Sequence, residues 1–183
     1  NDLHPLARVP GLGVLECFGV GVDARHVGRI PGEYLRAVTL AARHVDYAPT
    51  GNPLGDPYMR KVAVWLPREY DRRDGGPGQR FPVLYDLVGF TGSGLAHVGW
   101  KPFGDNLPER AARLIHERKM GPAIFVFPGC FTSLGGNQYV NSSATGNYAD
   151  YLTREIIPFV DRQFRTLASR EHRGCFGKSS GGY

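Results

Sequence analysis

The spacing of hydrophobic residues predicts strands in several segments of the chain. In residues 59–67, Val62, Val64 and Leu66 are spaced by two, which places their side chains on one face of an extended strand. Three further segments are nearly continuous apolar runs, as in strands covered on both faces: residues 81–90, 122–128 and 172–177. Residues 33–45 fit a strand and a short helix equally well.

A helix is predicted to begin after Asn106. This residue is a suitable N-cap, and Glu109 follows three positions later, as a capping box requires. Four apolar residues then fall on one helical face: Leu107, Ala111, Leu114 and Ile115. Gly121 is expected at the C′ position, and Pro122 cannot continue the helix.

A second helix is predicted over about residues 148–164. Pro158 lies inside it and is expected to kink it, because the carbonyl of Arg154 loses its hydrogen-bond donor. The order is therefore strand, helix, strand, helix, strand. Such alternation predicts an α/β fold with a parallel sheet, helices on both faces and right-handed crossovers.

Composition and charge exclude several classes of protein. The 183 residues are 42% hydrophobic and 21% charged, as in a soluble globular domain. The net charge is +5, but the basic residues are dispersed, so no nucleic-acid partner is expected. No apolar run approaches the ~18 residues of a membrane span, and the first residues lack a signal-peptide pattern. Three cysteines without a C-x-x-C spacing suggest reduced thiols, and we expect a cytoplasmic location.

The closing stretch GCFGKSSGGY, residues 174–183, carries the strongest chemical signal. Ser179 lies between Gly177 and Gly181 in a G-x-S-x-G pattern that directly follows an apolar run. A serine nucleophile on a sharp turn between a strand and a helix needs small residues two before and two after it. The same stretch resembles the end of a phosphate-binding loop, but that motif requires a glycine where His172 stands.

An oxyanion hole would need two backbone donors near Ser179. One is the N–H of Ser180, which follows the nucleophile, and the other is expected from the loop over residues 87–94. We favour the N–H of Phe90, with Gly89 as a second candidate and substrate neighbour. Alternatively, this segment is only a flexible connection. His97 either lines the cleft or is an exposed loop residue.

Three stretches of the sequence resemble the "putative esterase" family of α/β-hydrolases: FPVLYDLVGFTGSG, FVFPGCFTSLGGNQYVNS and REHRGCFGKSSGGY. This family includes enterochelin esterases, S-formylglutathione hydrolases, feruloyl esterases and antigen 85 mycolyltransferases, and the chain is most similar to its enterochelin-esterase-like members. The resemblance implies a three-layer α/β-hydrolase sandwich with antiparallel N-terminal strands. It implies Ser179 as the nucleophile and the N–H groups of Phe90 and Ser180 as oxyanion donors. It implies no metal and no organic cofactor.

The resemblance places the family's other catalytic residues outside the sequence. In α/β-hydrolases an Asp or Glu and then a His follow the nucleophile, and the four residues after Ser179 include neither. We therefore expect residues 1–32 to be an N-terminal extension and residues 33–183 to be the N-terminal portion of one α/β-hydrolase domain. The remainder is expected as a second chain or as further residues, with a homo-oligomer as an alternative. This portion alone is expected to be inactive.

The polar loop over residues 131–146 is a candidate wall of the substrate cleft, because the carboxyl ends of strands face the ligand in α/β sheets. Its candidate contacts are Asn137, Gln138, Tyr139 and Asn141. Alternatively, the loop orders itself with its own side-chain hydrogen bonds. Cys130 and Cys175 are expected to be small, buried apolar residues.

The sequence therefore predicts a serine esterase that hydrolyses a small-molecule carboxylic ester or thioester through an acyl-enzyme on Ser179. Three alternatives stay open: an acyltransferase of the same fold, a non-catalytic binding module of the same fold, and a nucleotide-binding protein.

Overall fold

The computed structural model describes residues 34–41, 54–71 and 78–183. Within these ranges a five-stranded sheet has the order β1-β2-β4-β3-β7. Its strands are β1 (Tyr34–Ala41), β2 (Met59–Leu66), β3 (Val83–Leu87), β4 (Ile124–Phe127) and β7 (Arg173–Gly177). Two short strands, β5 (Asn141–Ser142) and β6 (Gly146–Asn147), form a separate hairpin. The proposed extension over residues 1–32 lies outside the described residues.

Parallel and antiparallel strands share the sheet. β1 pairs antiparallel with β2, and β2 pairs antiparallel with β4. β3 is parallel to both β4 and β7. The segment that fitted a strand or a helix is the strand β1, paired with β2 along its whole length from Tyr34 opposite Leu66 to Ala41 opposite Met59. The expected α/β fold with antiparallel N-terminal strands is confirmed.

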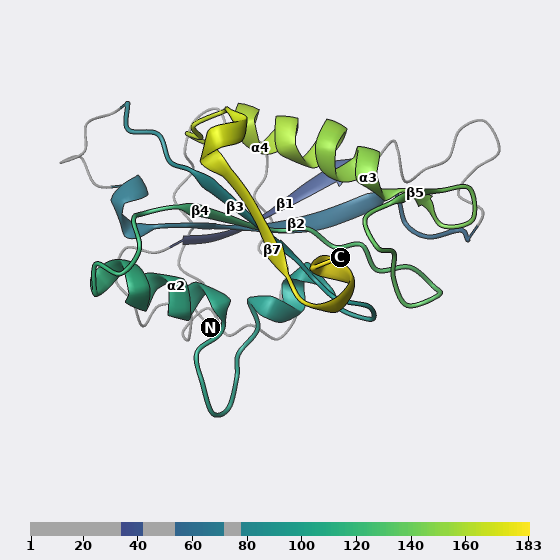
Figure 1. Cartoon of the computed structure of the whole chain (residues 1–183), viewed down its shortest axis with the longest axis horizontal. Helices are drawn as coiled ribbons and strands as arrows, with labels where there is room; N and C mark the ends of the chain where they lie inside the picture. The colour runs from purple at the N-terminus through teal and green to yellow at the C-terminus, as the bar shows by residue number, and fades with distance from the viewer. Residues whose placement is uncertain (1–33, 42–53, 72–77) are drawn as a thin grey trace, which may run out of the picture.

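Helices cover both faces of the sheet. α2 (Leu107–His116) lies on one face, and the continuous helical segment α3 (Tyr148–Asp150), η4 (Tyr151–Ile156) and α4 (Ile157–Gln163) lies on the other (Figure 1). Val62, Val64 and Leu66 pack in the core beneath the second helical segment, as the period of two predicts. Ala63 and Trp65 pack on the opposite face with the buried side of α2. Short 3-10 helices occupy the connections: η1 (Arg68–Tyr70), η3 (Gly94–His97), η5 (Arg170–His172) and η6 (Ser179–Gly181).

α2 begins as predicted and ends earlier. The Asn106 side chain accepts from the Glu109 N–H, and the Glu109 side chain accepts from the Asn106 N–H, which completes the capping box. Arg118, with φ +57°, takes the left-handed C′ position that was expected of Gly121. The Lys119 N–H donates to the Leu114 carbonyl at 2.9 Å, and this 6→1 bond replaces the glycine stop.

The proline in the second helical segment changes its hydrogen-bond pattern. Residues Tyr151–Ile156 form a π-helical stretch that ends two residues before Pro158. Because Pro158 has no N–H to give to the carbonyl one turn back, a wider turn relieves the mismatch. The expected disturbance at this proline therefore takes the form of a π-helical stretch.

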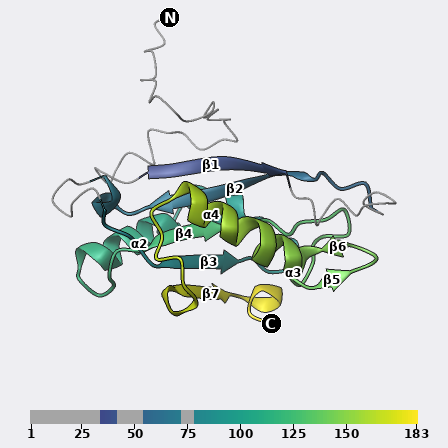
Figure 2. The same ribbon diagram turned by 90° about the horizontal axis from the view of Figure 1, so that it is seen from above.

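β7 lies at the outer edge of the sheet, with the C-terminus beside it (Figure 2). It pairs with β3, from Val83 opposite Arg173 to Leu87 opposite Gly177, and no other described strand pairs with it. The expected buried strand is therefore wrong for this chain: two of its residues are half-buried and three are exposed. Cys175, expected to be buried, is exposed, whereas Cys130 is buried. A strand needs neighbours on both edges to be covered, and its own sequence does not supply them.

Among the helices in the described part of the chain, none has the length and apolar character that crossing a bilayer requires.

Candidate active site

The backbone turns sharply at Ser179, directly after β7. Lys178 is still extended, with φ −128° and ψ 146°, whereas Ser179 has φ +57°. The Gly181 N–H donates to the Lys178 carbonyl at 3.1 Å, and the Gly182 N–H donates to the Ser179 carbonyl at 2.8 Å. A left-handed serine between a strand and a 3-10 turn is a strained conformation, of the kind that clusters at functional sites.

Close packing explains why glycine stands on both sides of this turn. A Cβ on Gly177 would lie 2.2 Å from the Leu87 carbonyl oxygen, and one on Gly181 would lie 1.7 Å from the same oxygen. The end of β7 and the turn therefore press directly on the backbone at the end of β3. The small residues that the motif requires are needed here because no side chain fits.

The turn separates the two serines by exposure. Ser179 is exposed, whereas Ser180 is buried with 9% of its surface exposed. The hydroxyl-bearing residue that solvent and a ligand can reach is thus Ser179, the one that the G-x-S-x-G pattern selects.

The loop after β3 lies against this turn. A Cβ on Gly89 would lie 3.4 Å from the Ser179 Cβ and 3.0 Å from the Lys178 carbonyl oxygen. The Gly92 N–H donates to the Gly89 carbonyl at 3.0 Å, so residues 89–92 close a turn beside Ser179. Between described residues, the N–H of Phe90 makes no hydrogen bond. The structure therefore brings Gly89 next to the predicted nucleophile, and Phe90 follows Gly89 in the same turn; their role as oxyanion donors stays a prediction.

The predicted cleft residues of the loop after β4 take different positions. Asn137 is buried, donates to the Thr145 hydroxyl at 2.7 Å and accepts from the Val140 N–H. The Asn141 side chain accepts from the Asp150 N–H, and Gln138 is exposed. These asparagines thus order the loop itself, and their contact with a substrate stays a prediction.

Tyr139 reaches across to the loop after β3. It has φ +57°, and its hydroxyl donates to the Val88 carbonyl at 3.2 Å. Burial raises the pKa of this hydroxyl, and the neighbouring Cys130 thiol raises it further. Tyr139 therefore keeps its proton at neutral pH and remains a donor.

The structure shows one bonded side-chain pair near this end of the sheet that was not predicted from the sequence. The His97 Nδ1 bonds to the Asp86 carboxylate, which is 2% exposed, whereas the His97 side chain is 40% exposed. Asp86 is the next-to-last residue of β3. An acidic residue inside an apolar run was the available signal, because a buried carboxylate requires a partner.

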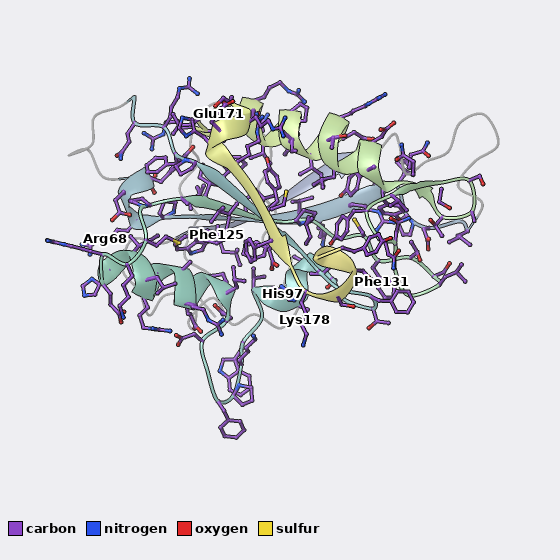
Figure 3. The ribbon with its side chains drawn as sticks, in the orientation of Figure 1. Arg68, His97, Phe125, Phe131, Glu171 and Lys178 are labelled. Carbon is purple, nitrogen blue, oxygen red and sulfur yellow. The ribbon has the colours of Figure 1, made fainter. Side chains whose placement is uncertain are left out.

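His97, Lys178 and Phe131 lie on the side of the molecule where β7 leads into η6, whereas Glu171 lies near the opposite end of β7 (Figure 3). Within residues 34–41, 54–71 and 78–183, no three or more His, Cys, Asp or Glu side chains are grouped as a metal site would require.

Comparison with protein families gives a match that spans most of the chain. Residues 57–183 match the family described as "Putative esterase". The chain belongs to this esterase family. A curated relative is the endo-1,4-beta-xylanase/feruloyl esterase of Xylanibacter ruminicola, which is 28% identical over 124 residues. That match covers 68% of this chain and 16% of the relative.

Solved structures share the fold of this esterase chain. The ferulic acid esterase of Anaeromyces mucronatus, in complex with ferulic acid, is 18% identical with a TM-score of 0.59 and covers 84% of this chain. An S-formylglutathione hydrolase from Agrobacterium tumefaciens is 19% identical with a TM-score of 0.57 and covers 82%. The matches span 52% and 50% of those chains, so the chain spans about half the length of these structures.

Proposed function

We propose that the protein containing this chain is a serine esterase and that Ser179 is its nucleophile. The observation that carries the proposal is the backbone at Ser179, which is left-handed, exposed and held between two glycines that leave no room for a Cβ. Membership of the esterase family supports the reaction class. In this reaction the Ser179 Oγ attacks the ester carbonyl carbon, its proton passes to a base, and a tetrahedral oxyanion forms.

The oxyanion is proposed to be held by two backbone donors. The N–H of Phe90 is unpaired among the described residues, and its neighbour Gly89 lies against Ser179. The N–H of Ser180 follows the nucleophile in the same turn. When the tetrahedral intermediate collapses, the alcohol or thiol leaves with a proton and the acyl group stays on Oγ; water then releases the acid and regenerates Ser179.

The general base and its acidic partner are proposed to lie in sequence beyond Tyr183. This chain spans about half of the matched structures, which leaves room for both residues. Asp86 and His97 form a pair within the chain. Their bond connects η3 to β3, and His97 is not proposed as the base of Ser179.

The substrate is proposed to be a small-molecule carboxylic ester or thioester. Two aromatic side chains are exposed in the loops after β3 and β4: Phe90 is 56% exposed and Phe131 is 48% exposed. They would offer an apolar surface to the acyl or leaving group. The binding of ferulic acid by the Anaeromyces mucronatus relative supports a phenolic acyl group as one candidate.

A p-nitrophenyl ester tests the proposal in the protein that contains this chain. We expect a burst of p-nitrophenol that equals the enzyme concentration, followed by slower turnover. Ser179→Ala should lose both the burst and at least about 10³-fold of kcat. Ser143→Ala, which alters an exposed serine of the loop after β4, is the matched control and should keep both. Normal turnover in Ser179→Ala would overturn the assignment.

A further inference from the structure

The loop after β3 holds a conformation that its own sequence does not favour. Thr91, a β-branched residue, has φ +63° inside the turn formed by residues 89–92. A β-branched residue in the left-handed region persists only where surrounding contacts hold it there. Gly89, two positions earlier, adds freedom that some contact must also remove. The orientation of the peptide between Gly89 and Phe90 therefore depends on groups outside the loop.

The loop after β4 supplies the contacts on the far side of that peptide. The Thr91 N–H donates to the Gly135 carbonyl at 2.8 Å. The Phe90 ring lies on the backbone of the same glycine, so that a Cβ on Gly135 would be 2.9 Å from the ring carbon Cζ. Gly135 and Gly136 have φ of +101° and +154°, which lets their backbone present a flat surface to the ring.

Tyr139 supplies the contact on the near side. Its hydroxyl donates to the Val88 carbonyl at 3.2 Å, one residue before Gly89. The Tyr139 hydroxyl and the Gly135 carbonyl thus bracket the Gly89–Phe90 peptide from both ends. We call these two groups the clamp.

Further hydrogen bonds hold the segment that carries the Gly135 carbonyl. The buried Thr132 hydroxyl accepts from the Gly136 N–H at 3.1 Å and from the Leu134 N–H at 3.2 Å. From β2, the Arg60 guanidinium donates to the Phe131 carbonyl at 2.8 Å. The loop that carries the clamp is therefore hydrogen-bonded to the central sheet on one side and to the loop after β3 on the other.

We propose that Tyr139 is a positioning residue that fixes the Phe90 N–H toward the oxyanion, acting through the Val88 carbonyl and together with Gly135. This inference rests on the proposed function. A donor that is misplaced by a fraction of an ångström loses most of its preference for the transition state over the ground state. Loss of the hydroxyl should therefore slow the chemical step and leave substrate binding almost unchanged.

The test compares two tyrosine-to-phenylalanine variants in the whole esterase. Tyr139→Phe should lower kcat roughly tenfold and change KM by less than about twofold. The matched control is Tyr151→Phe, because the buried Tyr151 hydroxyl makes no hydrogen bond to the residues that the structure describes; this variant should keep the wild-type kcat. A second readout is the affinity for an arylboronic acid, whose adduct on the serine carries a tetrahedral negative charge. The affinity for this boronic acid should weaken roughly tenfold in Tyr139→Phe and stay unchanged in Tyr151→Phe.

Each outcome decides between the two proposals. If Ser179→Ala is inactive while Tyr139→Phe keeps its kcat and boronate affinity, the clamp has no role and the esterase assignment stands. If Tyr139→Phe has a lower kcat, a higher KM and a lower Tm than the Tyr151→Phe control, the hydroxyl is only structural and the inference is wrong. If Ser179→Ala turns over normally, the proposed function itself fails.

Discussion

β4 and β7 flank the same central strand, β3, and both run parallel to it, yet they differ in burial and in the number of neighbouring strands. All four residues of β4 are buried, whereas three of the five residues of β7 are exposed. β4 has hydrogen-bonded strands on both edges and side chains packed on both faces. β7 has one described neighbour. The serine turn thus follows a strand that is much less covered than β4.

The comparison shows that two kinds of force shape the sheet. β4 is fixed by burial of large side chains, which is a collective and tolerant interaction. The turn after β7 is fixed by direct contact between backbone atoms, through Gly177 and Gly181 against Leu87. Such contact is local and admits no substitution. We expect mutations to affect the two regions by different mechanisms.

The largest effect on activity is expected at Gly181. Gly181→Ala would place a Cβ 1.7 Å from the Leu87 carbonyl oxygen, so the turn must move away from β3. We expect loss of esterase activity and a decrease in the free energy of unfolding of about 3 kcal/mol. Activity assays and guanidinium titration measure the two effects.

Gly121→Ala is the control for that substitution, because a Cβ on Gly121 meets nothing within 4 Å. It should preserve activity and change the free energy of unfolding by less than about 0.5 kcal/mol. Equal behaviour of the two variants would show that backbone contact does not shape the turn.

A matched pair of phenylalanines tests the difference in burial. Phe127 on β4 is fully buried, and Phe176 on β7 is 37% exposed and meets Phe125 edge-on at 6.2 Å between ring centroids. Phe127→Ala should cost about 3–5 kcal/mol of unfolding free energy. Phe176→Ala should cost about 1–2 kcal/mol, because water already reaches part of its ring.

Guanidinium titration of both variants sharpens the comparison. A cost at Phe176 equal to that at Phe127 in the complete protein would show that further sequence covers β7 there.

The smallest effect is expected at the helix that leads into β4. Asn106→Ala removes the side chain that caps α2 and leaves the Glu109 N–H without this partner. The expected loss is about 1 kcal/mol of unfolding free energy, with kcat unchanged, because the Asn106 side chain bonds Glu109 and Val98 and no residue of the Ser179 turn. A thermal unfolding curve together with an esterase assay provides the check. A large loss of activity would mean that α2 positions the site.

Local signals in the sequence predicted local structure well. The capping box at Asn106 and Glu109 and the alternating face of β2 are both visible from spacing alone, because each depends on neighbours in the chain. The predicted end of α2 was wrong, because Arg118 adopts a left-handed conformation that glycine more commonly takes. Propensity did not reveal which residue would accept that strain.

Features that depend on tertiary neighbours were not predictable. The exposure of β7 depends on which strands lie beside it, and the partner of Asp86 comes from η3 rather than from its own strand. Tyr139 was expected to contact substrate, and its hydroxyl instead donates to the Val88 carbonyl in this structure. Sequence patterns gave no information about which atoms of these residues would meet.

Covalent labelling tests the central claim most directly. A fluorophosphonate reacts with an activated serine and remains on its oxygen, as an acyl group does. After treatment of the complete protein, intact-mass measurement and peptide mapping should find one adduct, on Ser179, and none in Ser179→Ala. An adduct on another residue, or ester hydrolysis without any adduct on Ser179, would contradict the account.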